Sequence, residues 1–277
     1  MNNITFIIFT YNEEKRISFA IRSFIKYGKV IIMDGGSTDK TEEIAISMGA
    51  EFYIRPNVSK AYVETQDNFE FVKEKAKTDW IYWGYVDNIA SPLLINRVND
   101  IISNNKFKMI LVPLYTYLWG DVSNVCLKSR APMFWHRDFM DFSDNYIHGM
   151  GRFIGSKKQI CYLPMSKKYC LHHFSTYNTK KFVEGHLKYS QEEAIGKNAR
   201  GKKYSTLRML AAMFRYLWIY RRSLRRHPLG LIIVLNYAFF RLMAYSKLYE
   251  IENNIDLDSI EKKYSLQKEK ILFESKL

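Results

Sequence analysis

The chain has few of the features that mark secreted or metal-stapled proteins. Its 277 residues include only three cysteines, Cys126, Cys161 and Cys170, and their spacing is not that of a metal site. An odd number of thiols gives no disulfide framework, so we expect packed thiols in a reduced cytoplasm. Met1 leads directly into an apolar strand pattern, so we also expect no signal peptide.

Long uninterrupted apolar runs are absent as well. The run over residues 229–235 continues through Asn236 to Tyr245 but contains Arg241, whereas a membrane span needs roughly eighteen consecutive apolar residues. With 47% hydrophobic and 25% charged residues, the chain is neither disordered nor a multi-span membrane protein. Its length fits one large α/β domain with a helical appendage.

Acidic residues are scarce in the second half of the chain. Residues 1–150 hold 17 Lys and Arg against 18 Asp and Glu, whereas residues 151–277 hold 25 against 10. The whole excess of the +14 net charge therefore lies in the second half. A near-neutral first half and a basic second half indicate an anionic surface as partner.

The most informative segment is Val30–Thr41. Three β-prone apolar residues lead to Met33, Asp34, two glycines and a helix start, where Asp39 and Glu42 have capping-box spacing. Open α/β sheets bind nucleotides where a strand ends at such a turn. The alternative is that the Asp-Gly-Gly sequence forms only an ordinary tight turn. Glycine lets the backbone approach a ligand, and the acid accepts hydrogen bonds from a base or ribose.

A second strand and turn precede this one. Residues 5–10 have the pattern of a buried strand, residues 11–14 form a polar turn, and a helix follows with apolar residues on one face. Residues 50–54 are a plausible third strand. Right-handed crossovers would set the two polar turns side by side at the carboxyl edge of a parallel sheet.

These two segments resemble a known family. The sequence Phe9–Glu14, followed by Met33–Thr41, resembles the N-terminal signature of family 2 glycosyltransferases with the GT-A fold, an α/β fold with a mostly parallel central sheet. The resemblance implies that Thr10, Tyr11 and Glu13 line the nucleotide pocket. It also implies that Asp34 bonds the base, with Gly35 close to the donor.

The third family landmark is altered in this chain. Where the family has a strand ending in Asp-X-Asp, this sequence has Tyr85, Val86 and Asp87. The resemblance places Tyr85 and Val86 beside the donor and leaves Asp87 as a single anchor for Mg²⁺ or Mn²⁺. One carboxylate suffices, because phosphate oxygens and water complete the octahedron. The alternative is that Asp87 and Asn88 only cap a helix beginning near Pro92.

Catalytic candidates come from the segment 138–149. Inverting glycosyl transfer needs a general base near the acceptor hydroxyl. Relatives that decorate lipopolysaccharide core have a His-Glu pair at about this place, but here His148 is followed by glycine. The base is therefore either Asp144, our first choice, or His148. A lone histidine is also often a hydrogen-bonded structural residue.

Two adjacent histidines follow a probable strand at 159–163. The resemblance implies a terminal histidine that closes over metal and diphosphate, and we favour His173 over His172 for this role, against a purely structural one. On the next helix, expected over 180–194, His186 is predicted to pack. Four basic side chains are open candidates for phosphate contacts: Arg152, Lys180, Lys181 and Lys188.

The basic half contains two apolar helical patterns. Over 205–226, large apolar residues share one face while Arg208, Arg215 and Arg222 recur along another. This arrangement is typical of a helix in the membrane interface, and the run over 229–245 predicts a second shallow helix. Basic residues near an anionic leaflet contribute about 1 kcal/mol each. The alternative is that both helices pack onto the catalytic domain.

The sequence thus predicts a GT-A catalytic domain over residues 1–178 and a basic helical region over 179–277. We expect an inverting glycosyltransferase, peripheral on the inner face of the cell membrane, that uses a UDP-type sugar and a lipid-linked or cell-surface glycan acceptor such as lipopolysaccharide core or capsule. A sugar-nucleotide nucleotidyltransferase is less favoured because residues 11–14 are no glycine-rich lysine loop.

Two further alternatives stay open, a degenerate scaffold and a nucleic-acid-binding protein. Tyr85 in place of an acid motivates the scaffold. We expect no nucleic-acid partner, because the arginines alternate with aliphatic residues rather than with stacking aromatics. The sequence indicates no oligomeric state.

Overall fold

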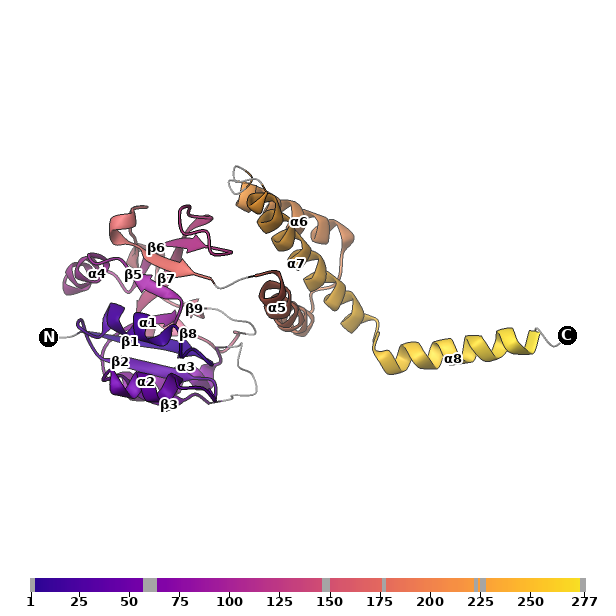
Figure 1. Cartoon of the computed structure of the whole chain (residues 1–277), viewed down its shortest axis with the longest axis horizontal. Coiled ribbons are helices and arrows are strands. Elements are labelled where there is room, and N and C mark those ends of the chain that lie inside the picture. The colour runs from indigo at the N-terminus through magenta and orange to yellow at the C-terminus, as the bar shows by residue number, and fades with distance from the viewer. Residues whose placement is uncertain are drawn as a thin grey trace. The chain divides into compact units, whose positions relative to one another are not determined.

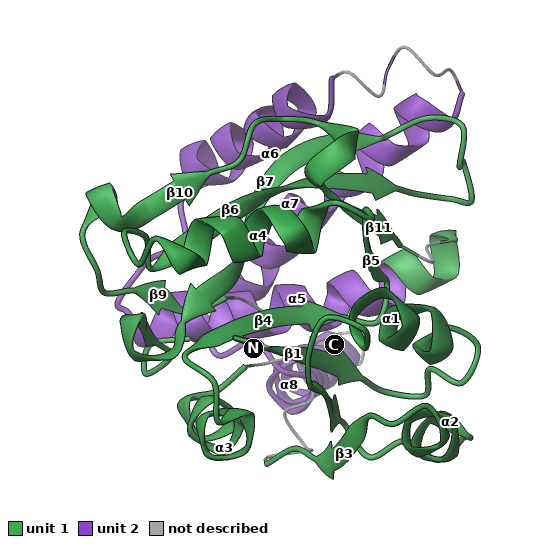
Figure 2. Cartoon of the chain, turned by 90° about the vertical axis from the view of Figure 1, so that its left-hand side faces the viewer, with its two compact units in different colours: residues 1–182 green, residues 183–277 purple. Residues whose placement is uncertain are grey.

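The computed structural model describes residues 3–56, 64–145, 150–175, 178–221, 224 and 228–274. It divides the chain into two compact units, residues 1–182 and 183–277 (Figures 1 and 2). The division falls inside helix α5 (Thr179–Ala199), close to the predicted boundary at residue 178. Each unit is described by itself.

The first unit begins with a parallel sheet. Strand β1 (Ile4–Thr10) lies between β2 (Val30–Asp34) and β4 (Trp80–Tyr85), and β3 (Glu51–Ile54) lies beyond β2. All seven residues of β1 are buried, as expected for a parallel strand covered on both faces. Three helices connect these strands: α1 (Ile17–Phe24), α2 (Thr41–Ser47) and α3 (Gln66–Ala76).

Further strands, paired both antiparallel and parallel, extend the sheet on the other side of β4. The order continues through β7 (Leu127–His136), β6 (Met109–Tyr117), β11 (Leu171–Phe174) and β5 (Asn88–Ala90). Helix α4 (Leu94–Ser103) follows β5. Strand β10 (Ile160–Tyr162) pairs with β6, and β8 (Met140–Asp141) pairs with β9 (Arg152–Phe153). Short 3₁₀ turns lie at Arg137–Phe139, Lys157–Gln159 and Lys167–Tyr169.

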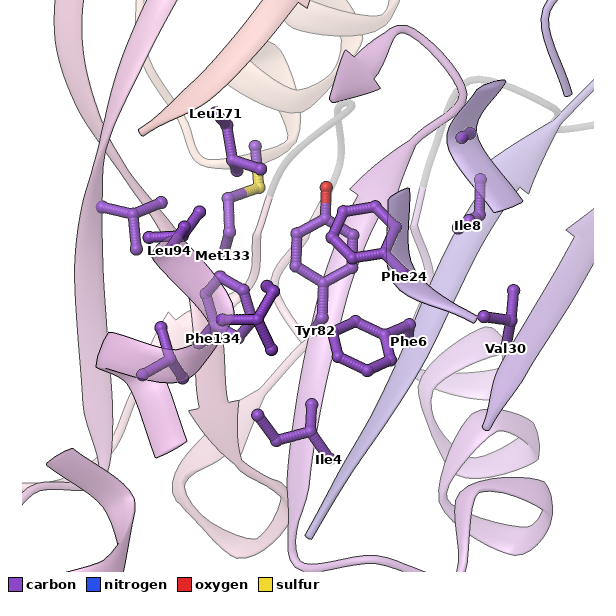
Figure 3. Close-up of a cluster of buried hydrophobic side chains, with 14 of the residues drawn as sticks. Ile4, Phe6, Ile8, Phe24, Val30, Tyr82, Leu94, Met133, Phe134 and Leu171 are labelled. Carbon is purple, nitrogen blue, oxygen red and sulfur yellow. The ribbon is translucent and has the colours of Figure 1, made fainter. Parts of the chain in front are cut away.

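The core between the sheet and α1 is aromatic. The ring centroids of Phe6 and Phe24 lie 5.0 Å apart, and those of Phe24 and Tyr82 lie 4.6 Å apart (Figure 3). On the opposite face, Trp83 and Trp135 pack with their ring centroids 5.5 Å apart. These buried rings hold the strand ends, and with them the polar turns, in a fixed arrangement.

Several predicted elements need correction. Asp87 and Asn88 do not cap the helix near Pro92, because β5 intervenes and α4 begins at Leu94 without a side-chain cap. Of the helix predicted over 205–226, α6 covers Thr206–Tyr220, and residues 222, 223, 225 and 226, with the predicted Arg222, lie outside the described residues.

The cysteines have no disulfide partner. Cys126 and Cys170 are buried and Cys161 is half-buried, which confirms the prediction of packed thiols. Burial raises the pKa of Cys170 to about 11 and also raises the pKa of Cys161. All three therefore stay protonated near neutral pH or lie out of reach of solvent.

The second unit is helical. It contains most of α5, then α6, α7 (Leu229–Glu252) and α8 (Leu257–Glu274). His186 of α5 is buried with its ring 4.8 Å from that of Phe240, which confirms its predicted packing role. Helices α6 and α7 pack through stacked Tyr220 and Tyr237, whose ring centroids lie 4.1 Å apart.

A buried ion pair joins α5 to α7. The Arg241 guanidinium donates to both carboxylate oxygens of Glu193, at 2.9 and 2.5 Å, and Lys197 lies 2.7 Å from the same carboxylate. Burial by itself raises the pKa of Glu193, but the two cations outweigh it and hold that pKa below its ordinary value. The arginine inside the apolar run is therefore a packing residue of this helical unit.

Apolar side chains remain exposed on α6. Leu207, Phe214 and Trp218 are 79%, 66% and 66% exposed, and the exposed Arg208 and Arg215 lie beside them. We call these three apolar residues the α6 stripe. Among the described residues, α7 is the one helix long and apolar enough, by length and composition alone, to cross a membrane. It is longer than the predicted shallow helix.

Candidate active site

The two polar turns after β1 and β2 meet around Asp34. Its carboxylate is fully buried and accepts hydrogen bonds from the Thr10 hydroxyl (2.8 Å), the Gly36 amide (2.7 Å), and the amide and hydroxyl of Ser37 (both 2.6 Å). This carboxylate therefore shapes the turn. Its predicted contact with a nucleotide base stays a prediction.

Asn12 fastens the first turn to the second. Its backbone adopts the left-handed region with a φ of 53°, which asparagine tolerates better than most residues. The Asn12 side-chain oxygen accepts from the Thr38 amide at 2.8 Å, and the Asn12 amide donates to the Ser37 hydroxyl at 2.7 Å. The expectation that both turns lie side by side at the carboxyl edge of the sheet is confirmed.

Asp39 has a different role from the predicted capping box. Helix α2 begins at Thr41, and Lys40 is its cap without a side-chain bond. The Asp39 carboxylate accepts from the Thr41 amide at 3.0 Å and from the Glu14 amide at 3.1 Å. Glu42 is not its partner. The reason is that the acid links the turn after β1, through Glu14, to Thr41, the first residue of α2.

The predicted donor-binding residues lie around this edge. Tyr11 is 51% exposed, and Gly35 lies against it, since a Cβ on Gly35 would come 3.4 Å from the Tyr11 ring. Val86 is buried, while the Tyr85 hydroxyl donates to Glu64 at 3.3 Å. Tyr11 is thus free to face a ligand, whereas Tyr85 is engaged with an acid that the sequence analysis did not single out.

Glu13 is held by Arg16 in two hydrogen bonds of 2.7 and 2.5 Å. Burial raises the pKa of the Glu13 carboxyl, and the nearby charge of Asp87 adds to that rise, although Arg16 opposes it. Arg16 also helps to lower the pKa of Asp87. The turn after β1 and the end of β4 are therefore electrostatically coupled.

Asp87 and His173 face one another across the ends of β4 and β11. The His173 Nε2 lies 3.1 Å from the Asp87 Oδ2, and the backbone amide of Phe174 donates to the Asp87 carbonyl at 2.9 Å. The imidazole is further held by Ser175 and Thr116, at 2.9 and 3.2 Å. Burial raises the pKa of Asp87, but the neighbouring imidazole and Arg16 outweigh it and hold that pKa below its usual range.

This pair fits a divalent cation. The Asp87 Oδ1 is buried and has no hydrogen-bond partner among the described residues. Carboxylate and imidazole are suitable ligands, and a hard cation between phosphates needs few protein groups. The described ranges contain no cluster of three or more acidic, histidine or cysteine side chains, so the remaining ligands would be phosphate oxygens and water.

His172 points to a different environment. Its Nδ1 lies 3.1 Å from the Tyr117 hydroxyl, and its Nε2 lies 3.4 Å from the Cys170 sulfur. Burial lowers the pKa of His172, with Lys167 adding to the effect. Adjacent strand residues face opposite sides of a sheet, which explains why one histidine meets Asp87 and the other packs.

The candidate bases are only partly located. Asp144 is exposed in the turn after β8, and its neighbour Asn145 donates to the Glu64 carbonyl at 2.7 Å. His148 lies outside the described residues. Arg152, a candidate phosphate contact, pairs with Asp141 at 2.5 Å.

Glu64 is the residue that sequence reasoning missed. It is 1% exposed and touches both Tyr85 and Asn145. No local pattern marked it, because its partners come from segments 21 and 81 residues away.

Comparison with known proteins identifies the chain. The family described as Glycosyl transferase family 2 matches residues 5–160, more than half of the sequence. This chain belongs to glycosyl transferase family 2. It is therefore a glycosyltransferase, and together with the mostly parallel first half of the sheet this membership confirms the predicted GT-A type of α/β fold.

Relatives of this glycosyltransferase match it along nearly its whole length. An uncharacterized glycosyltransferase of Rickettsia typhi is 26% identical, and the match covers 91% of this chain and 88% of the relative. One from Rickettsia prowazekii is 24% identical, with the same coverage of each chain. The match extends beyond the catalytic unit, so the helical second unit is part of what these proteins share.

Two solved structures have a partly similar course of the chain. Glucosyl-3-phosphoglycerate synthase from Mycobacterium tuberculosis, solved with Mn²⁺ and UDP-glucose, is 16% identical with a TM-score of 0.47, covering 74% of this chain and 81% of that one. S. aureus TarS is 14% identical with a TM-score of 0.42, covering 69% of this chain and 39% of that one.

Proposed function

We propose that this glycosyltransferase moves a sugar from a UDP-type nucleotide sugar to a lipid-linked or cell-surface glycan, with inversion at the anomeric carbon. One observation supports this most directly. Beside His173, at the same sheet edge as the two interlocked turns, a buried carboxylate oxygen of Asp87 has no hydrogen-bond partner within the part of the chain that the structure describes. Such an edge combines a place for a nucleotide with a place for its diphosphate.

Asp87 and His173 would hold a Mg²⁺ or Mn²⁺ ion. When bound, the cation would neutralise charge on the leaving diphosphate. Tyr11 would pack against the base, and Thr10, Gly35 and Val86 would line the same pocket. Asp34 and Glu13 would fix the shape of that pocket through the bonds to Thr10, Ser37 and Arg16.

The acceptor hydroxyl needs a group that removes its proton. Asp144 is the proposed base, and His148 is the second candidate. Asp144 is exposed, so an acceptor can reach it from solvent. Asn145, in the same turn as Asp144, donates to the Glu64 carbonyl, and the Glu64 carboxylate accepts from Tyr85 at the end of β4. Glu64 therefore links the turn that carries the proposed base to this strand end.

The second unit would place the enzyme on an anionic membrane, peripheral on the cytoplasmic face. The α6 stripe exposes large apolar groups beside Arg208 and Arg215, and the excess positive charge lies in this half of the chain. Apolar groups flanked by arginines favour the boundary between headgroups and acyl chains. A lipid-linked acceptor, such as one for lipopolysaccharide core or capsule, would be met there.

A non-catalytic scaffold is the second candidate, because Tyr85 replaces the first acid of the family motif. Release of UDP from UDP-sugars, measured with and without Mn²⁺, separates the two. The wild-type protein should show metal-dependent release. The Asp87→Ala variant should lose about a hundredfold or more in rate, as expected for removal of electrostatic stabilisation at the leaving group.

UDP-glucose is a suitable first donor for a panel of nucleotide sugars, and a thermal-shift assay with Mn²⁺ identifies the one that binds. Equal turnover in wild type and Asp87→Ala would contradict the metal assignment. Absence of turnover with every donor that binds would favour the scaffold.

A further inference from the structure

A groove beside the proposed metal site is lined mainly by residues that the function above does not use, apart from Arg16, Val86 and Asp87. It is a cavity of about 650 Å³ in the first unit, between one face of α1 and the segment from Val86 to Pro92. We call it the α1 groove. Asp87 forms part of its wall, so a molecule in the α1 groove lies next to the proposed site of the diphosphate.

The lining of the α1 groove is largely apolar. Ile89, Ala90 and Pro92 line it from the β5 side, and Phe19 and Phe174 lie at its surface with 55% and 40% of their area exposed. Two exposed phenylalanines at one cavity would gain from an apolar ligand that covers them. The cavity is large enough for a small organic ligand.

Cations line the α1 side of the same cavity. Arg22 lies in the last turn of α1 and Lys26 follows two residues after the helix ends, and both side chains line the cavity. The Arg22 guanidinium lies 4.8 Å above the Phe19 ring, and the Lys26 ammonium lies 4.9 Å above the Tyr27 ring.

Arg22 and Lys26 have no ion-pair partner among the described residues. Arg16, the third cation of the lining, is paired with Glu13. Two uncompensated positive charges at an apolar cavity are complementary to an anion that carries an apolar group.

We propose that the α1 groove binds the lipid-phosphate end of the acceptor, a phosphate or diphosphate attached to an apolar chain. Arg22 and Lys26 hold the phosphate, and Phe19, Ile89 and Phe174 cover the chain. Two cations suit a group with two or more negative charges better than a phosphodiester with one. This assignment rests on the proposed function, because a lipid-linked acceptor must lie near the donor.

Farnesyl phosphate is the probe, since it joins a phosphomonoester to a short apolar chain. Calorimetric titration of the full chain below the micelle concentration of the probe, with Mn²⁺ and UDP present, should show saturable binding. Arg22→Gln and Lys26→Gln should each weaken binding about tenfold, which corresponds to loss of one charge-assisted hydrogen bond. Phe19→Ser should weaken it as well.

Lys106→Gln is the matched control. Lys106 is exposed and lies 5.4 Å above the ring of Phe107, so the same charge and the same kind of ring contact are removed away from the α1 groove. The affinity of the Lys106→Gln variant for farnesyl phosphate should equal that of the wild-type protein. Thermal unfolding of every variant confirms that the fold is retained.

Three results would overturn the proposal. Unchanged affinity in the Arg22, Lys26 and Phe19 variants would place the probe elsewhere. Inorganic phosphate binding as tightly as farnesyl phosphate would make this a plain anion site, and dihexanoyl phosphatidylglycerol binding as tightly would make it a site for membrane phospholipid. UDP release by wild type without any acceptor tests the proposed function separately, since it needs no occupant in the α1 groove.

Discussion

Two neighbouring histidines in β11 have different chemical surroundings although they are adjacent in sequence. His173 meets the carboxylate of Asp87, whereas His172 lies between Tyr117 and the Cys170 thiol. The alternation of a strand separates them, so a pair of identical side chains supplies one candidate ligand and one packing residue.

His173→Gln should therefore lower metal-dependent UDP release by about a hundredfold, because it removes a group beside the leaving diphosphate. His172→Gln should leave the metal dependence in place and lower mainly the stability, by about 1–3 kcal/mol for a disturbed buried polar contact. Titrating the rate with Mn²⁺ distinguishes them, since only His173→Gln should require more Mn²⁺ for half-maximal rate. Identical Mn²⁺ curves for both variants would contradict the assignment of His173.

Asp34 offers a second test at the scale of one residue. Asp34→Asn would turn one acceptor oxygen into an amide donor opposite the amides and hydroxyls that it now accepts from. We expect a loss of about 1–3 kcal/mol in the free energy of unfolding, measured with urea, because a buried donor is left without an acceptor. Unchanged stability together with lost nucleotide affinity would show instead that Asp34 acts chiefly as a ligand contact.

At the scale of helices, the ion pair between α5 and α7 is the clearest determinant of packing in the second unit. The side chains of Arg241 and Glu193 are only 10% and 14% exposed, so removing one partner leaves a buried charge. The pair also explains why an arginine is tolerated within the apolar run of α7.

Glu193→Gln should cost about 3 kcal/mol of unfolding free energy at neutral pH. The pKa of Glu193 is lowered in the folded state, so the stabilisation is present above its ordinary value of 4.5 and is lost as the pH falls through the folded value. The difference between wild type and variant should thus shrink in acid. Glu250→Gln, which breaks the more exposed pair with Lys247, is the control and should cost less than about 1 kcal/mol.

The strands of the sheet differ in how well the sequence predicts them. The parallel half of the sheet was predictable, because β1 and β2 are short apolar runs with polar turns and a helix with one apolar face follows each. The pairing of β5 with β11 was not, since those strands are short and lie some eighty residues apart in the chain.

The candidate site divides in the same way. Asp87 and the two turns could be found from motifs that follow strand ends, and His173, which lies within β11, was indicated by the family resemblance. Glu64 and the α1 groove could not, since they depend on side chains that converge only after folding. Asp39 was assigned to the wrong partner because its spacing to Glu42 imitates a capping box.

At the scale of the whole molecule, the net positive charge lies in one half of the chain, together with a row of exposed apolar side chains. The basic excess lies in residues 151–277, and the α6 stripe belongs to the second unit. Vesicle binding should therefore combine an electrostatic part that salt weakens with an apolar part that it does not.

Vesicles containing phosphatidylglycerol should bind the full chain at low salt, and raising the salt to about 1 M should remove most binding. Phe214→Ser with Trp218→Ser should lower the affinity further at every salt concentration, because these side chains would enter the interface. Ile46→Ser, on an exposed residue of α2, is the control and should change little. Equal binding of neutral vesicles, or no effect of the paired α6 substitutions, would refute membrane attachment by this surface.

The full or partial burial of the three thiols has a practical consequence for measuring the distance between the two units. Maleimide reagents react with thiolates, which Cys126, Cys161 and Cys170 offer poorly because burial shields their sulfur atoms or disfavours ionisation. A cysteine introduced at an exposed position in each unit would be modified first, with the native residues left in place. Pairs of fluorophores attached in this way would report the distance between the units as nucleotide, metal or vesicles are added.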